Sequence, residues 1–285
     1  MSSPPVHPKE GSLPPGGMVR CDERVMSPWR RLDVELDAWR AAGRQALLWW
    51  RDDDACRDSP QLSRLVAIAG QTNTPVALAV IPALAEPSLI DALAKADVVT
   101  VVQHGYAHRN HAPAGARNWE LGNHRPLHRS MAELEEGRIS LERRFGRRFA
   151  PLLVPPWNRI DPGIVEQLPQ RGFRGLSTFG PRAQAMPVPG LVQCNTHVDP
   201  IAWRRDRAFI GVDAAIDRLV LNLAARRGGT VDPSEPTGLL THHLDFPAAA
   251  WDFLADLLAH TRRHVAATWI DVHTAFGGVT SVRSA

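Results

Sequence analysis

The chain contains 285 residues, of which 44% are hydrophobic and 22% are charged, and its formal net charge is +3. This length and balance suit one domain with a large core, and no apolar run approaches the ~20 residues of a membrane span. The slight positive charge forms no concentrated basic stripe, so we expect neither a nucleic acid nor a membrane as a partner.

The N-terminal segment has an unusual composition. Met1 to Val19 contains five prolines and three glycines, without the cationic and apolar regions of a secretory signal. We therefore expect a disordered tail over residues 1–22, a single catalytic domain over residues 23–280, and a cytoplasmic location. The three cysteines form no CxxC pair, which is consistent with free thiols in that compartment.

From residue 28 onward, the apolar pattern alternates between the periods of helix and strand. Helices are expected at 28–42, 60–71, 84–96, 130–145, 162–171, 213–226 and 248–264, and strands at 45–51, 75–81, 98–103, 150–154, 175–179, 191–196, 238–241 and 267–272. Such alternation predicts βαβ units and a parallel sheet. No strand leads into a G-x-G-x-x-G turn, so the pattern favours an α/β barrel over a dinucleotide-binding sheet.

Polar residues gather where the predicted strands end. They are Asp52 to Asp54, His104 with His108, Pro155 to Trp157, His197 with Asp199, and His242 with His243. The carboxyl ends of parallel strands share one rim of a barrel, and chemistry gathers at that rim. A random distribution of the twelve histidines would not place so many there.

The spacing of two histidines indicates a metal site. His104 and His108 are four residues apart, which puts them on one face of a helical turn, and Asp54 can complete a trio of ligands with positions open for water. We expect a divalent metal, zinc first, on these three residues. His111 or His243 would be a ligand if the trio were shifted, and each could instead be an ordinary hydrogen-bonded histidine.

In order and spacing, five motifs resemble those of the polysaccharide deacetylase family, the NodB-homology or carbohydrate esterase four group. They are Arg51 to Ala55, His104 to His108, Val154 to Asn158, Asp199 to Trp203, and Leu240 to His242. The resemblance covers roughly residues 45 to 275. It implies a distorted (β/α)7 barrel with Asp54, His104 and His108 as the metal ligands.

The same resemblance assigns catalytic roles. It implies that Asp53 is the general base and that His242 is the general acid. An oxyanion also needs a backbone donor, and because Pro155 and Pro156 lack an N–H, the first donor after that bend is Trp157.

Residues near the reactive rim are expected to contact the substrate. They are Pro156, Trp157, Trp203, His197 and Arg159. Trp157 and Trp203 in particular could form a wall on which a sugar ring stacks.

The sequence departs from the family pattern in two places. Val154 stands where the family has the arginine that holds the base, so Arg51 or Arg159 is expected to replace it. Ala202 stands where the family has a carboxylate that tunes the acid histidine, and Asp199 is a candidate substitute. The register of the three aspartates stays open by one residue, because successive strand residues face opposite ways.

These observations predict a metal-dependent hydrolase that removes an N- or O-acetyl group from a small or soluble carbohydrate-like substrate. One alternative is hydrolysis of a linear amide C–N bond in a non-sugar compound on the same barrel. Another is a barrel that binds a glycan without turnover. The substrate, the native metal and the oligomeric state are not determined by the sequence.

Overall fold

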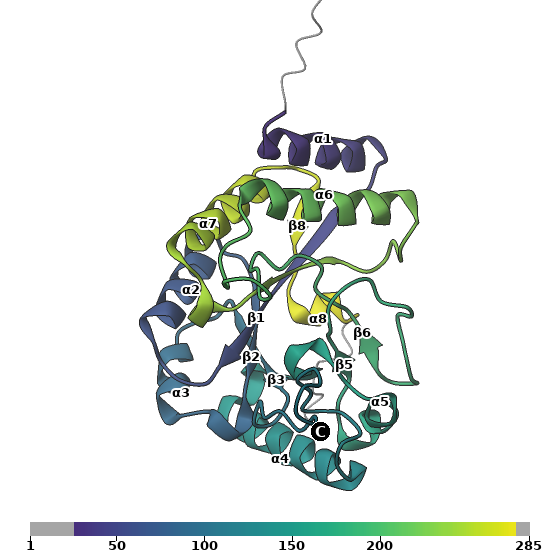
Figure 1. The fold of residues 1–285 in the computed structure, drawn as a ribbon. Helices are drawn as coiled ribbons and strands as arrows, with labels where there is room; N and C mark the ends of the chain where they lie inside the picture. Colours follow the sequence, from purple (N-terminus) through teal and green to yellow (C-terminus); the bar gives the residue numbers. More distant parts are fainter. Residues whose placement is uncertain (1–25, 278–285) are drawn as a thin grey trace, which may run out of the picture.

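The computed structural model describes residues 26–277, in which strands and helices alternate as the apolar pattern predicts (Figure 1). The strands are β1 (Ala46–Ala55), β2 (Val76–Val80), β3 (Val99–His104), β4 (Phe149–Val154), β5 (Gly175–Leu176), β6 (Val192–Gln193), β7 (Thr237–Thr241) and β8 (Ala267–Trp269). The helices are α1 (Pro28–Ala41), α2 (Pro60–Gln71), α3 (Pro87–Leu93), α4 (Leu127–Phe145), α5 (Pro162–Gln167), α6 (Val212–Gly228), α7 (Ala248–Arg262) and α8 (Val272–Ala275). The predicted tail over residues 1–22 lies outside the described residues.

Several helices start at a proline that follows a capping residue. Proline occupies the first turn of α1, α2, α3 and α5, where a missing N–H costs no helical hydrogen bond. The hydroxyl oxygens of Ser27 and Ser59 accept hydrogen bonds from the backbone N–H groups of Arg30 and Leu62, at 3.3 and 3.0 Å. These caps fix where α1 and α2 begin.

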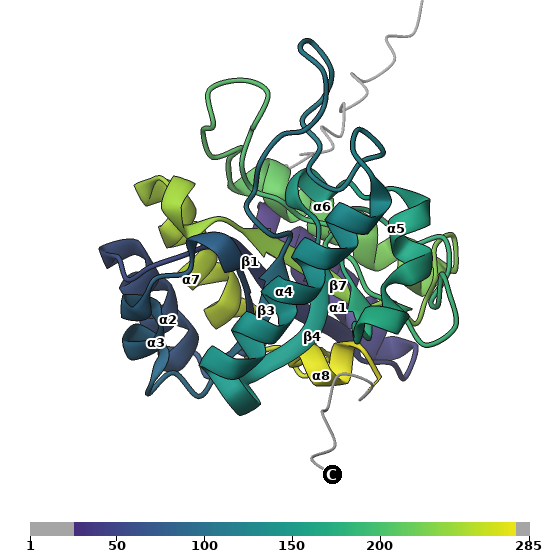
Figure 2. The ribbon, with the colours of Figure 1, turned by 90° about the horizontal axis from the view of Figure 1, so that it is seen from below.

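All strand pairs are parallel, and the order across the sheet is β6-β5-β4-β3-β2-β1-β7, with β8 paired to the start of β1. Single bridges continue the pairing from Phe179 to Thr196 and from Val198 to Leu239. The strands therefore curl toward one another with helices outside them, and the predicted distorted (β/α)7 barrel is confirmed (Figures 1 and 2).

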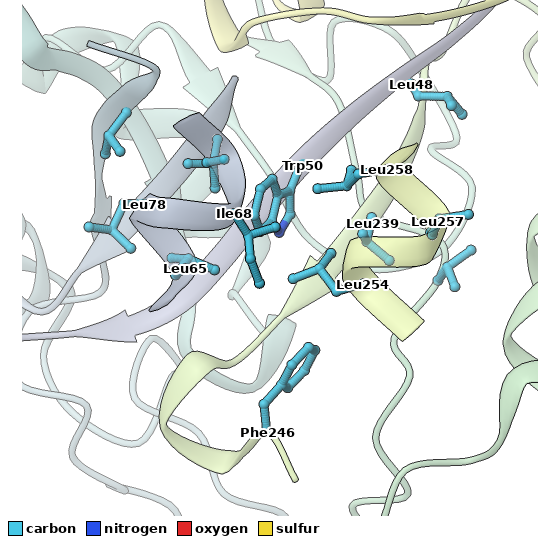
Figure 3. Close-up of a cluster of buried hydrophobic side chains, with 14 of the residues drawn as sticks. Leu48, Trp50, Leu65, Ile68, Leu78, Leu239, Phe246, Leu254, Leu257 and Leu258 are labelled. Carbon is cyan, nitrogen blue, oxygen red and sulfur yellow. The ribbon is translucent and has the colours of Figure 1, made fainter. Parts of the chain in front are cut away.

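The two faces of β1 have different surroundings. Trp50 packs with side chains of α2 and α7 in the large outer core, as Figure 3 shows. Trp49 belongs to a second buried cluster, and its ring meets Phe276 edge-on at a centroid distance of 5.8 Å. Since side chains alternate along a strand, Arg51 and Asp53 follow Trp49 to the inner face.

The lengths of several elements differ from the prediction. β1 continues to Ala55 and includes the acidic residues that were expected just after it. β5 and β6 have two residues each, because the segments around them bond through isolated bridges and side chains instead of a regular ladder. The last strand ends at Trp269 instead of residue 272, and α8 begins at Val272 after Asp271, whose side chain accepts a hydrogen bond from the Thr274 N–H.

Among the described residues, no helix is both long and apolar enough to cross a membrane.

Candidate active site

An irregularity at the end of β1 decides where the three aspartates point. The pairing of β1 with β2 shifts register between Asp52 and Ala55, and Asp54 has a left-handed backbone with φ 71°. Such a bulge breaks the strict alternation of a strand, so Asp53 and Asp54 can both face the cavity. Asp52 faces the other way.

The histidine motif follows β3, and it is not helical. Residues 105–109 form an open loop in which Gly105 and His108 both have φ 53°, so the predicted helical turn is wrong. The loop instead folds around Glu120, whose carboxylate accepts hydrogen bonds from the N–H groups of Tyr106, Ala107 and Arg109 at 3.1, 2.8 and 3.2 Å. Those N–H groups have no helical partners, and the buried carboxylate satisfies them.

Gly105 is required by this arrangement. A Cβ atom there would lie 2.0 Å from a Glu120 carboxylate oxygen and 2.6 Å from the Pro156 ring. The loop thus passes between two side chains with no room for a larger residue.

Asp54, His104 and His108 converge. One ligand atom from each lies within 4.8 Å of the others, and the Nε2 atoms of His104 and His108 lie 3.1 and 3.3 Å from Oδ1 of Asp54. Nδ1–H of His104 donates to the Val154 carbonyl oxygen at 3.0 Å, which turns the lone pair of Nε2 toward the carboxylate.

The donor set fits a divalent cation. Oδ1 of Asp54 is buried and makes no hydrogen bond with a described group, although two imidazole nitrogens face it. Lone pairs that face one another are unfavourable unless a proton or a cation lies between them. Two nitrogens and one oxygen suit zinc, and they leave other coordination positions open.

The charges of this cluster shift the pKa values of its three members. Burial would raise the pKa of Asp54, but contact with His104 and the charges of nearby histidines hold it well below its usual range. Burial would lower the pKa of His104, yet the charges of Asp53 and Asp54 keep it above its ordinary value. Burial and the charge of His104 lower the pKa of His108.

Asp53 is held by an arginine on its own strand. Nε and Nη2 of Arg51 lie 2.9 and 3.0 Å from the two carboxylate oxygens of Asp53. Arg51 is fully buried and crosses the barrel, where Nη1 donates to the hydroxyl of Ser177 at 2.7 Å and Nη2 to the side-chain oxygen of Asn158 at 2.7 Å. Of the two arginines expected to replace the one missing at Val154, Arg51 contacts Asp53, whereas Arg159 donates to the Asn118 carbonyl oxygen.

Asp52 joins β1 to the end of β7. Its carboxylate accepts from the Thr241 hydroxyl at 2.5 Å and from the His243 N–H at 3.1 Å, and it lies 2.5 Å from Nδ1 of His243. Both side chains are buried, so His243 is committed to Asp52 and is not a ligand of the cluster.

His242 faces Asp53. Its Nε2 lies 4.0 Å from Oδ2 of Asp53, and its ring meets Trp203 edge-on with centroids 4.5 Å apart. Nδ1 of His242 is buried without a hydrogen bond to a described group. Asp199 accepts hydrogen bonds from the N–H groups of Ile201 and the Trp203 indole, at 3.0 and 2.7 Å, and among the described residues no hydrogen bond joins it to His242.

The turn after β4 has strained geometry. Trp157 and Asn158 both have left-handed backbones, with φ 55° and 56°, and two other residues of the site, Asp54 and His108, share this property. Positive φ is uncommon for residues other than glycine, above all for a bulky one such as Trp157, and it tends to persist at functional sites. The turn brings the ring of Trp157 against that of His108, with centroids 4.4 Å apart and the planes tilted by 58°.

One cavity, of about 1360 Å³, unites most of the predicted residues. Its wall contains Asp53, Asp54, His104, His108, Trp157, Trp203 and His242. Pro156 is buried behind the turn, and Arg159 lines a neighbouring cavity of about 860 Å³.

The ring of His197, which was expected to contact the substrate, has partners within the protein. Its Nδ1 accepts from the Gly238 N–H at 3.0 Å, and its Nε2 lies 3.3 Å from Glu235.

Sequence reasoning missed Glu120 and Asn158. Glu120 lies between Trp119 and Leu121, and a carboxylate flanked by two large apolar residues in a polar loop is a signal of a buried acceptor. Asn158 is part of the third motif, but nothing in the sequence shows that it meets Arg51.

Comparisons with known proteins bear on the fold. No family model matches the sequence, and no curated protein matches it. A protein from Mycobacterium smegmatis described as a polysaccharide deacetylase is 18% identical, with a TM-score of 0.60 over 82% of this chain and 90% of that one. The peptidoglycan deacetylase PdaC from Bacillus subtilis is 14% identical, with a TM-score of 0.52 over 82% and 91%.

The Bc1960 peptidoglycan N-acetylglucosamine deacetylase is 16% identical, with a TM-score of 0.51 over 84% of this chain and 96% of that one. At identities this low, the structural similarity establishes a shared fold only. The resemblance that the motifs indicate is confirmed at that level, and the chemistry has to be argued from the site itself.

Proposed function

We propose that this protein is a metal-dependent deacetylase that hydrolyses an N- or O-acetyl group on a carbohydrate-like substrate. The observation that carries the proposal is the meeting of Asp54, His104 and His108 beside Asp53 and His242 on the wall of one cavity. Three potential ligands supported by an acid–base pair suit hydrolysis with an activated water. The catalytic unit proposed is the domain over residues 23–280.

Asp54, His104 and His108 would hold the metal. A divalent ion bound there supplies Lewis-acid chemistry and makes water more acidic. Asp53 faces the same space and would accept the proton of the attacking water as general base. Arg51 keeps the Asp53 carboxylate fixed through two contacts, so that the base cannot rotate away from the cluster.

His242 and Trp157 would complete the reaction. His242 lies across from Asp53, and the 4.0 Å between Nε2 and the carboxylate oxygen is a separation at which a reacting group can contact both. We assign His242 the protonation of the leaving nitrogen or oxygen, because an unprotonated amine leaves poorly. The backbone N–H of Trp157 would donate to the oxyanion of the tetrahedral intermediate.

Substrate contacts are assigned from the lining of the cavities. Trp157 and Trp203 present aromatic surface to the larger cavity, and Trp203 is 37% exposed, which suits stacking against a sugar ring. Pro156 would shape the turn behind Trp157, and Arg159 would reach the substrate from the neighbouring cavity. His197 is not included, since both of its ring nitrogens face partners in the protein.

The test is a panel of acetylated compounds with direct measurement of released acetate. The panel contains acetylated amino sugars, sugar acetate esters and linear amides, and each is incubated with zinc-loaded protein and with chelated protein. We expect acetate from at least one acetylated sugar, dependent on the metal and lost in the Asp53→Asn variant.

Release of acetate from the linear amides alone would show that the substrate is a non-sugar amide and not a carbohydrate. Binding of an acetylated sugar without any acetate release would indicate a glycan-binding barrel and would contradict the proposal.

A further inference from the structure

Three arginines converge where the two cavities meet. Arg117 and Arg159 line the cavity of about 860 Å³, and Arg204 lines the larger cavity that contains Asp54. Asn158 is in the wall of both cavities, so they are neighbours. Figure 2 shows that the loop before α4 and the loop before α6, which carry Arg117 and Arg204, extend from the same end of the barrel.

These guanidinium groups repel one another. Burial lowers the pKa of Arg159, and the positive charges of Arg117 and Arg204 lower it further. Among residues 26–277, no carboxylate forms an ion pair with Arg159. The acidic residue on the wall of the smaller cavity, Glu166, is exposed on α5.

Other arginines at the mouth of the larger cavity do have partners. Arg207 pairs with Asp245 at 3.2 Å, and Arg218 donates to the Asp199 carbonyl oxygen at 2.8 Å. Within residues 26–277, by contrast, neither Arg117 nor Arg204 forms an ion pair, and Arg159 donates only to the Asn118 carbonyl oxygen, at 2.6 Å. The three arginines therefore leave positive charge available in the cavity that contains Asp54 and in its neighbour.

We propose that the substrate carries an anionic group, a carboxylate or a phosphate, which Arg117, Arg159 and Arg204 bind while the acyl group lies at Asp54. This inference rests on the proposed function, because it places the acyl group at the same cluster. A bound anion would replace the repulsion among the three guanidinium groups by charge-assisted hydrogen bonds. Arginine forms such bonds well with both carboxylates and phosphates.

Three consecutive residues connect the walls of the two cavities. Trp157 lines the reactive cavity, Asn158 lines both, and Arg159 lines the second. Two residues of backbone span at most about 7 Å, so the two cavities adjoin, and we expect the anionic group and the acyl group on one sugar unit or on adjacent units.

The experiment compares three probes by titration calorimetry with the zinc-loaded protein. They are N-acetylglucosamine, which is neutral, N-acetylglucosamine 6-phosphate, and N-acetylmuramic acid, which carries a carboxylate. We expect at least one anionic probe to bind about tenfold more tightly than the neutral sugar, and added salt should weaken that preference.

Arg159→Gln and the double variant Arg117→Gln/Arg204→Gln should each remove most of that preference. Arg143→Gln, which removes an exposed arginine of α4, is the matched control and should retain it. Thermal unfolding of each variant shows whether its fold is intact.

The phosphate and carboxylate probes identify the preferred anion, and a preference for either one supports the proposal. Equal affinity for all three probes, absence of binding by all three, or a preference that survives both sets of substitutions would overturn it.

Acetate measured in the same samples separates this inference from the proposed function. Acetate release without any preference for the anionic probes would contradict only the anion subsite. A preference for the anionic probes that depends on the arginines, without acetate release, would contradict only the proposed hydrolysis.

Discussion

Asp52, Asp53 and Asp54 follow one another on β1, yet each carboxylate faces a different partner. Asp52 binds His243 and Thr241, Asp53 binds Arg51, and Asp54 faces two imidazoles. The family resemblance implied different roles for Asp53 and Asp54, but it left the register open, because regular alternation along a strand cannot place two successive side chains on one side. The bulge at Asp54, which no local sequence signal announces, removes the ambiguity.

Replacement of Asp53 by asparagine should separate proton transfer from metal binding. Asn keeps the shape of the side chain but cannot accept the proton of water, so we expect acetate release to fall by about 10²–10⁴. Metal content should stay unchanged, because Asp53 is not one of the three ligands. Asp58→Asn, at an exposed site after β1, is the control and should retain activity. Full activity in Asp53→Asn would exclude Asp53 as the base.

Arg51 should be essential for both stability and activity. Its guanidinium satisfies Asp53, Ser177 and Asn158 at once, and a lysine cannot reproduce that fork. Breaking a buried ion pair costs about 3–5 kcal/mol, so Arg51→Met should lower the free energy of unfolding by that order. Urea unfolding measures this change.

Arg51→Lys is expected to fold better than Arg51→Met but to have a lower kcat, since Asp53 would lose its orientation. Arg40→Lys, at an exposed pair on α1, is the control for the loss of a guanidinium. If Arg51→Lys had the stability and kcat of the wild type, the fixed geometry of Asp53 would be unimportant.

Among the structural elements, the loop that carries His108 is held in place by one acidic residue, Glu120. Glu120 binds three N–H groups of residues 106–109, and this arrangement replaces the helical turn that the histidine spacing suggested. A four-residue spacing specifies neighbours only if the backbone is helical. Here Gly105 and His108 adopt positive φ, and a distant carboxylate, which pattern analysis cannot assign, fixes the loop.

Glu120→Gln should weaken metal binding without contacting the metal. A glutamine has one acceptor oxygen in place of two, so one or two loop N–H groups would lose their partner and His108 would lose its position. We expect the zinc affinity, measured by competition with a chelator, to fall about 10–100-fold. Glu136→Gln, which removes an exposed carboxylate from the hydroxyl of Tyr106, should leave the affinity unchanged. Equal affinities of the two variants would show that Glu120 does not organise the loop.

The existence and order of the elements were predictable, and their ends were less so. The buried strands β1 to β4 and the long helices have clear periodic apolar patterns, and these were identified correctly. β5 and β6 are short because this part of the barrel is held by side chains such as Arg182, which donates to the Gln193 carbonyl oxygen and to Asp232. Contacts of this kind leave no periodic signal in a sequence.

On the scale of the whole molecule, the Asp52–His243 pair joins residues 191 positions apart and closes β1 against the segment after β7. Burial would lower the pKa of His243, but the charge and hydrogen bond of Asp52 raise it above the ordinary value of 6.5. The folded protein therefore holds this proton more tightly than the unfolded chain does.

The contribution of His243 to stability should depend on pH with a definite sign. It is fully present below the unfolded pKa of 6.5 and is lost as the pH rises through the higher folded pKa. The difference in unfolding free energy between the wild type and His243→Gln should thus shrink as the pH increases above 6.5. Denaturant titrations at a series of pH values measure it, and a difference that grows with pH would contradict the assignment.

The motifs predicted the fold of the protein better than they predicted the contacts within the site. The barrel was implied by five short motifs and is confirmed by the solved structures, although identity to them is 18% or less in the cases compared. The replacement of the motif arginine required coordinates, since Arg51 and Arg159 were equal candidates by sequence. Arg51 lies on the same strand as Asp53 and contacts both of its carboxylate oxygens, so in the proposed site the base is held from β1.

The measurement that tests the central claim most directly is the metal content of the purified protein after zinc loading and removal of free ions. We expect about one zinc per chain in the wild type and in His111→Asn, and far less in Asp54→Asn, His104→Asn and His108→Asn. Absence of stoichiometric zinc from the wild type, or equal zinc in all of these proteins, would contradict the proposed site.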